Sequence, residues 1–311
     1  MKRKLINLII PAYNEEACVE ELSGRLTLLF DSEPNYDFEA IIVENGSTDT
    51  TWERLKAIAE RDSRFRIVRL SRNFRMDGGL TAGLQYATGD ACVLMTADLQ
   101  DPPELIHEFL RKWEDGWENI YGVVTRREGT GPLRTLNSKL FYLVAGKLTD
   151  GRIPKNASDF RLVDRKVYEV VRNMTERNRF IRGLFAWVGF KSIGVPMERP
   201  ARFGGVSNAH SMKVVDLAFK GIFANSYKPL RLISIFGLML SGLSFFALIP
   251  LAIIWITSGV PFAGFGTLVS LFLLVLGFLS LMLGILSEYV GLIYEEVKAR
   301  PNFIVSEIAG E

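Results

Sequence analysis

The sequence is poor in the side chains that bind zinc or form disulfide frameworks. It has two cysteines and two histidines in 311 residues. Cys18 and Cys92 have no histidine ligands nearby, so we interpret both as small core residues. We interpret His107 and His210 as structural or solvated residues, because neither has companion ligands. These shortages argue against a zinc site and against a small disulfide-stabilised domain.

No glycine-rich phosphate loop of the Walker or Rossmann type occurs in the chain. Its 37 basic and 35 acidic residues leave a net charge of +2, which gives no indication of nucleic-acid binding. We therefore expect no nucleic-acid partner. The length fits one catalytic-sized domain together with an additional membrane segment.

Charged residues are absent from two long apolar runs near the C-terminus. The runs extend from Leu232 to Ile256 and from about Thr267 to Leu286. Each can cross ~30 Å of hydrocarbon as a helix, for which about 20 residues suffice. A charge in the middle of a bilayer would cost several kcal/mol, so the absence of charge fits a spanning role. The sequence therefore predicts a transmembrane hairpin of two helices.

The charges that flank these runs predict their orientation. Lys228 and Arg231 precede the first run, Lys298 and Arg300 follow the second, and the connector 257–266 has no charge. By the positive-inside rule, the basic ends face the cytoplasm. We predict a multi-pass protein of the inner (plasma) membrane, with both termini and the preceding domain in the cytoplasm.

Before the first run, strand-like and helix-like segments alternate. Apolar runs that end in polar residues predict buried strands at 5–10, 38–44, 65–70 and 91–96. Helices are expected from Asn14, after a cap at Ser47 or Thr48, from Gly78 and from Pro102. This alternation predicts an α/β domain with a parallel sheet and right-handed crossovers, in which ligands bind beyond the C-terminal ends of the strands.

Polar residues gather at those strand ends. Asp98 and Gln100 follow the fourth expected strand and point the same way if the backbone is extended. A carboxylate and an amide oxygen suit a hard cation such as Mg²⁺ that keeps waters and takes phosphate oxygens from a nucleotide. The alternative is that Asp98 caps the helix at Pro102.

Two later segments mix basic and apolar residues with helical spacing. They cover 133–148 and 212–223, and the second leads into the first apolar run. Basic amphipathic helices beside a membrane anchor often lie in the headgroup plane. The alternative for both is a half-buried helix packed on the sheet.

An ordered set of short motifs over nearly the whole chain resembles the polyprenyl-phosphate glycosyltransferases of glycosyltransferase family two. This group is similar to dolichol-phosphate mannose synthases and bacterial undecaprenyl-phosphate glucosyl- or aminoarabinosyl-transferases. The matching stretches are 9–16, 70–74, 97–104, 159–162, 176–180, 187–190 and 288–301.

The resemblance implies a Rossmann-like glycosyltransferase A-type domain with a C-terminal two-helix transmembrane hairpin. It implies a domain at 1–210, an interfacial helix at 211–230, two spans at 231–288 and a cytoplasmic tail at 289–311. It also implies that a hexose moves from a nucleotide-sugar, expected to be a UDP-sugar, to undecaprenyl or polyprenyl phosphate with inversion. The expected partners include the lipid bilayer and further copies of the chain, in a homo-oligomer such as a tetramer.

The resemblance also implies roles for individual residues. Asp98 and Gln100 would hold Mg²⁺ or Mn²⁺ on the diphosphate, and Asp98 and Asp159 form the expected catalytic set. Asp159 would orient the acceptor phosphate, and its alternative is a structural ion pair with Arg161. The expected nucleotide- and phosphate-binding residues are Pro11, Ala12, Tyr13, Glu15, Glu44, Asn45, Gly46, Arg134, Ser138, Arg161, Arg202 and Ser207.

The chain departs from the family pattern in positions that normally carry charge. Glu44-Asn45 replaces paired aspartates, Thr96 replaces the first metal-binding aspartate, and Asn208 replaces a lysine. The loop 75–79 lacks its usual Gly-Lys-Glu sequence. Each loss weakens an electrostatic site. Two alternatives therefore stay open: a degenerate homologue that binds without efficient turnover, and a processive polysaccharide synthase.

Overall fold

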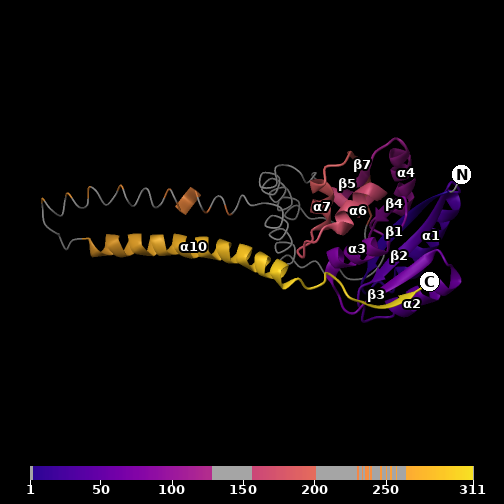
Figure 1. The fold of residues 1–311 in the computed structure, drawn as a ribbon, viewed down its shortest axis with the longest axis horizontal. Coiled ribbons are helices and arrows are strands. Elements are labelled where there is room, and N and C mark those ends of the chain that lie inside the picture. The colour runs from indigo at the N-terminus through magenta and orange to yellow at the C-terminus, as the bar shows by residue number, and fades with distance from the viewer. Residues whose placement is uncertain are drawn as a thin grey trace. The chain divides into compact units, whose positions relative to one another are not determined.

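The computed structural model describes residues 3–127, 156–200 and 264–310, with single positions between 230 and 257. The chain divides into two compact units. One contains residues 1–221 together with 300–311, and the other contains residues 222–299. The first unit holds a mixed sheet with helices on both faces, and the second holds a long apolar helix (Figure 1).

The sheet of the first unit has eight strands in the order β7-β5-β6-β4-β1-β2-β3-β8. Neighbours in β4-β1-β2-β3 are parallel, whereas β6 and β8 run antiparallel to their neighbours β4 and β3. The strands are β1 (Lys4–Ala12), β2 (Tyr36–Glu44), β3 (Phe65–Leu70), β4 (Ala91–Leu94), β5 (Asn119–Arg127), β6 (Ala157–Asp164), β7 (Ser192–Arg199) and β8 (Val305–Ala309).

Alternating side chains of the central strands build a core on each face of this sheet. Ile6, Leu8 and Ile10 of β1 pack with apolar residues of α1, α2 and α4, whereas Ile9 packs with those of α3, α6 and α7. The helices of this unit are α1 (Val19–Ser32), α2 (Thr51–Arg61), α3 (Arg75–Tyr86), α4 (Ile106–Glu114), α6 (Arg165–Asn173) and α7 (Ile181–Trp187), and a 3₁₀ turn at Pro103–Leu105 leads into α4.

The predicted α/β class is confirmed, and the first four strands form the predicted parallel core. The predicted parallel sheet does not extend beyond these four strands, because β6 and β8 pair antiparallel with β4 and β3. The helix predicted from Asn14 begins only at Val19. The N-cap of α2 is Thr50 without a side-chain cap bond, so the predicted capping by Ser47 or Thr48 was also wrong.

The segment that follows the long helix returns to the sheet. β8 pairs antiparallel with β3, and the Ser71 N–H donates to the Ile304 carbonyl at 2.9 Å. Phe303 and Val305 pack against buried apolar residues of β2 and β3. The segment predicted as a C-terminal tail therefore supplies the edge strand of the sheet.

The second unit contains α10 (Phe265–Lys298), a helix of 34 residues. At 1.5 Å per residue it is about 50 Å long, more than the thickness of a bilayer core. Within the described positions, one helix, at Leu274–Lys298, is long and apolar enough to cross a membrane. The second predicted span falls largely within α10. Most of the first lies outside the described residues, so the hairpin stays a prediction.

Candidate active site

The predicted nucleotide loop follows directly from β1. Pro11 and Ala12 are the last two residues of β1, and Ala12 pairs with Glu44, the last residue of β2. The turn Tyr13–Glu15 comes next. Because β1 and β2 are parallel, the two polar ends lie at one edge of the sheet, as predicted.

Hydrogen bonds fix this turn to the segment before α2. Asn14 has a positive φ of 54°, a conformation that asparagine tolerates better than most residues. Its N–H donates to Ser47 Oγ at 3.0 Å, and its side-chain oxygen accepts from the Thr48 N–H at 2.9 Å. The Glu15 N–H donates to Thr51 Oγ1 at 2.9 Å. These contacts explain why α1 starts late, since residues before it serve the turn.

Glu44 is a buried part of this frame. Its Oε1 accepts from the Ser47 N–H at 2.5 Å, and its Oε2 lies 3.2 Å from Nε of Arg69 on β3. The Arg69 guanidinium also lies over the Trp52 ring, 4.8 Å from the centroid. Glu44 thus replaces a shorter carboxylate with one that reaches Arg69.

Asn45 and Gly46 connect the end of β2 to the loop before α3. The Asn45 amide accepts from the Phe74 N–H and donates to the Arg75 carbonyl, both at 2.9 Å. Gly46 has a φ of 69°, and a Cβ there would lie 2.6 Å from the Arg72 carbonyl carbon. Only glycine fits this close approach without a backbone shift.

The segment after β4 brings the side chains of Thr96, Asp98 and Asp101 together. The Thr96 hydroxyl lies 2.7 Å from Asp98 Oδ1 and 2.8 Å from Asp101 Oδ2. The Gln100 N–H also donates to Asp98 Oδ1, at 3.3 Å, and the Gln100 side-chain nitrogen donates to the Pro200 carbonyl at 3.3 Å. Because a hydroxyl has one proton, Thr96 can donate to only one of the two carboxylates at a time.

Asp101 is fully buried. Burial raises its pKa, and the neighbouring Arg199 and the hydrogen bonds from Thr96 oppose that rise. Arg199 of β7 lies 3.3 Å from Asp101 Oδ1. The Thr96 hydroxyl therefore links Asp98 to Asp101, and Asp101 in turn pairs with Arg199.

The residues at this end of β4 fit a divalent cation that has few protein ligands. Asp98 and Gln100 supply a carboxylate and an amide oxygen, the donors that Mg²⁺ and Mn²⁺ accept alongside water and phosphate oxygens. No cluster of three or more His, Cys, Asp or Glu ligands occurs among the described residues. A divalent cation held by Asp98 and Gln100 stays a prediction.

Asp159 forms a two-pronged ion pair near the start of β6. Nε and Nη2 of Arg182 on α7 lie 2.9 and 2.6 Å from its two carboxylate oxygens. Burial would raise the pKa of Asp159, but the Arg182 charge and hydrogen bonds outweigh it and lower the pKa. The ion-pair alternative named Arg161. The structure instead places the Arg161 guanidinium on the carbonyls of Ser158 and Asp159.

Asp77 of α3 contacts the start of α7, the helix that carries Arg182. Its Oδ1 accepts from the Ile181 N–H at the first residue of α7, at 3.0 Å. Burial raises the pKa of Asp77 to about 6, the nearby Asp159 charge adds to the rise, and the Ile181 N–H opposes it. Asp77 fixes α7, and α7 positions Arg182 against Asp159.

The register of the sheet puts these groups at one edge. Leu94 of β4 lies beside both Ile9 of β1 and Arg161 of β6. Since β6 is antiparallel to β4, the start of β6 and the end of β4 face the same side. Arg199 lies close to Asp101 and Asp159. It forms an ion pair with Asp101, and its charge helps to lower the pKa of Asp159.

Four of the predicted binding residues lie outside the described residues: Arg134, Ser138, Arg202 and Ser207. The predicted segments 133–148 and 212–223 lie there too. Sequence reasoning missed Arg182, Asp77, Asp101 and Arg199. The motif at 176–180 ends two residues before Arg182. Asp77 lies in the loop 75–79, which we noted only because it departs from the family pattern.

The fold is that of an α/β protein with acidic side chains at the C-terminal edge of its parallel strands. The chain belongs to Glycosyl transferase family 2, whose model matches residues 7–172. The prediction that it is a glycosyltransferase enzyme is thereby confirmed.

Several relatives match over nearly the full length. The chain is 39% identical to an uncharacterized glycosyltransferase of Synechocystis sp., covering 98% of this chain and 96% of that protein. It is 32% identical to the SfII prophage-derived bactoprenol glucosyl transferase of Shigella flexneri, covering 97% of each. Among solved structures, glucosyl-3-phosphoglycerate synthase from Mycobacterium tuberculosis has a TM-score of 0.49 and 22% identity, covering 71% of this chain and 78% of that one.

Proposed function

We propose that the protein is a membrane-anchored inverting glycosyltransferase that moves a hexose from a nucleotide-sugar, a UDP-sugar by our prediction, to undecaprenyl or another polyprenyl phosphate. The observation that carries this proposal is that the end of β4, which leads to Asp98, and the start of β6, which carries Asp159, lie at the same edge of the sheet. Similarity over nearly the full chain to bactoprenol glucosyl transferases supports the lipid acceptor.

The donor side is assigned to the turn after β1 and the end of β2. Pro11, Ala12, Tyr13 and Glu15 would contact the nucleotide, and Glu44, Asn45 and Gly46 would keep their loop in place. Asp98 and Gln100 would hold a divalent cation. Such a cation, when bound, neutralises charge on the departing diphosphate.

The acceptor side is assigned to Asp159 and the ion pair that fixes it. A phosphate oxygen of the lipid attacks the anomeric carbon from the face opposite the diphosphate, the anomeric C–O bond breaks, and the nucleoside diphosphate leaves. A phosphate monoester is already an anion near neutral pH, so it needs positioning more than deprotonation. We assign that positioning to Asp159, with Arg134, Ser138, Arg202 and Ser207 as further phosphate contacts.

The membrane would hold the enzyme beside its lipid. The exposed apolar side chains of α10 support insertion of this helix, and Leu271, Phe272 and Leu281 are each about 60% or more exposed. We propose a cytoplasmic catalytic unit, two spans and cytoplasmic termini, as the flanking charges predict. A homo-oligomer such as a tetramer completes the proposal.

A transfer assay tests this function. Purified full-length protein is incubated with undecaprenyl phosphate, Mg²⁺ or Mn²⁺ and a panel of radiolabelled nucleotide-sugars, and the lipid phase is analysed. A lipid-linked monosaccharide supports the proposal, whereas a polymer supports a processive synthase. Absence of product with every donor would refute it and leave the degenerate homologue, which the neutral Thr96 motivates. Asp115→Asn, at an exposed position away from the site, is the control for surface changes.

A further inference from the structure

A second charged feature lies behind the Asp159 ion pair. Arg161 of β6 is only 3% exposed. Its Nη2 donates to the Ser158 carbonyl at 3.0 Å and its Nε to the Asp159 carbonyl at 3.4 Å. The guanidinium also lies over the Phe185 ring, 5.1 Å from the centroid. Within the described part of the chain, no carboxylate side chain forms an ion pair with Arg161.

A buried charge without a counter-ion is expensive. Desolvation of a charged group costs several kcal/mol unless a partner of opposite charge compensates it. Burial lowers the pKa of Arg161 to about 10, against the opposing pull of Asp159. The carboxylate of Asp159 is already engaged by Arg182. Arg161 and Arg182 therefore share the single nearby charge of Asp159, and only Arg182 pairs with it directly.

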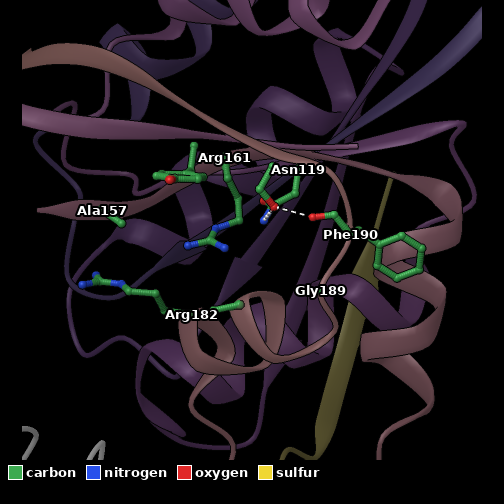
Figure 2. Close-up of a pocket in the computed structure, with 9 residues that line it drawn as sticks. Asn119, Ala157, Arg161, Arg182, Gly189 and Phe190 are labelled. Carbon is green, nitrogen blue, oxygen red and sulfur yellow. Dashed lines mark hydrogen bonds between the residues drawn. The ribbon is translucent and has the colours of Figure 1, made fainter. Parts of the chain in front are cut away.

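This guanidinium lines a small pocket, which we call the Arg161 pocket. Its cavity volume is about 100 Å³, and it is lined by Asn119, Tyr121, Ala157, Arg161, Arg182, Ala186, Gly189, Phe190 and Ser192. Since one water needs roughly 10–15 Å³, the pocket has room for several waters or one small oxyanion. Figure 2 shows Arg161 and Arg182 toward one end and Asn119 and Phe190 toward the other.

The far end of the pocket carries an unsatisfied polar group. Asn119 is buried, and its amide nitrogen donates to Ser192 Oγ at 3.0 Å. Its amide oxygen is buried and has no hydrogen-bond partner among the described residues. Because the two ends of an amide can exchange places, Asn119 can offer either a donor or an acceptor to a ligand.

We propose that the Arg161 pocket binds a terminal phosphate group, as a phosphate monoester or as inorganic phosphate. Arginine pairs with phosphate oxygens in a fork, and the ligand would supply the negative charge that Arg161 lacks. The site stands on the pocket alone. The assignment of the acceptor lipid as the source of the phosphate rests on the proposed function, and Arg182 then links the bound phosphate to Asp159.

Calorimetry on the purified full-length protein tests the site. Inorganic phosphate is titrated in the presence of EDTA and saturating UDP, so that neither a cation nor an empty nucleotide site holds it. We expect Arg161→Met to weaken phosphate binding tenfold or more. Asn119→Asp, which puts a like charge at the far end, should weaken it severalfold. Arg61→Met, at an exposed surface ion pair, should leave the affinity within about twofold.

Two outcomes overturn the inference. One is no binding by the wild-type protein with phosphate up to about 10 mM. The other is equal affinity in the wild type and in every folded pocket variant, with Asn119→Asp deciding if Arg161→Met does not fold. Farnesyl phosphate in a parallel titration distinguishes the sources. If Arg161→Met weakens the binding of farnesyl phosphate as much as that of inorganic phosphate, the ligand is a lipid headgroup. If inorganic phosphate binds and farnesyl phosphate does not, the ligand is free phosphate. The transfer assay on wild-type protein separates failure of the pocket from failure of the proposed function.

Discussion

The donor-side turn and the Asp159 cluster lie at the same edge of the sheet but are held in different ways. Around Asn14 and Asn45, neutral side chains bond to backbone groups. Around Asp159, the contacts are a two-pronged ion pair and a carboxylate at a helix start. These neutral contacts add no charge to the loop that we propose binds the diphosphate, and the nearby Glu44 is paired with Arg69. A charged cluster, in contrast, can exchange a partner for an anionic ligand.

Removing the charge of Asp159 should produce the largest effect on catalysis. Asp159→Asn keeps the shape of the side chain but removes the negative charge that pairs with Arg182. We expect sugar transfer to fall by about two to four powers of ten, because misplacing a reacting group by ~1 Å alone can cost a hundredfold. The measurement is the rate of lipid-linked product. Undiminished transfer by a variant with normal melting behaviour would return Asp159 to a structural role.

Asp77 tests the cluster through stability. Its folded pKa of about 6 exceeds the ordinary 3.8, so its stabilising contribution is present below about pH 4 and is lost as the pH rises to about 6. Asp77→Asn stays neutral and its amide oxygen can still accept from Ile181. The variant should match the wild type at low pH and be more stable above pH 6, by at most about 3 kcal/mol.

The measurement for Asp77 is thermal unfolding in detergent across this pH range. Asp115→Asn serves as the exposed control, and it should leave the pH profile unchanged. Parallel wild-type and Asp77→Asn profiles would show that Asp77 does not titrate with a raised pKa. The ion-paired cluster would then be less buried than its contacts indicate.

Arg182 should act through position more than through charge. Arg182→Lys keeps a cation but cannot make both bonds to Asp159, so we expect transfer to fall about ten- to a hundredfold. The loss should appear in kcat, and the KM for the nucleotide-sugar should stay nearly unchanged. A matching loss of donor affinity would place Arg182 on the donor side instead.

Thr96 gives the smallest expected effect and probes the donor side. Thr96→Asp adds a carboxylate beside Asp98 and Asp101, so Mn²⁺ affinity in the presence of UDP should rise about tenfold. Calorimetry measures this directly. An unchanged affinity would show that the Thr96 side chain does not face the cation. Tight Mn²⁺ binding by the wild-type protein without nucleotide would contradict the weak site that we infer.

Local sequence pattern predicted the parts of the fold that depend on local burial. The runs of β1 and β2 are long and apolar, and β3 has buried apolar residues at four of its six positions, so these strands could be found. β8 could not, because its five residues are all at least partly exposed and gain stability only by pairing with β3. The direction of β6 depends on the same kind of long-range pairing.

The site was predictable to a similar depth. Asp98 and Asp159 follow from short motifs, whereas the partners that fix them come from distant segments. Arg182 is 23 residues from Asp159, and Asp77 is 104 residues from Ile181. Pairings over such distances have no spacing rule in the sequence. Glu44 was placed at the correct strand end, but its bond to Arg69 depends on the neighbouring strand.

The most direct test of the division between donor and acceptor sides is a comparison of UDP-glucose binding by two variants. Asp98→Asn and Asp159→Asn are titrated by calorimetry with Mn²⁺ present, beside the wild type. We predict that Asp98→Asn weakens binding about tenfold or more, because it removes the carboxylate assigned to the cation. Asp159→Asn should bind within about twofold of the wild type. Equal losses in both variants, or a loss in Asp159→Asn alone, would contradict the division.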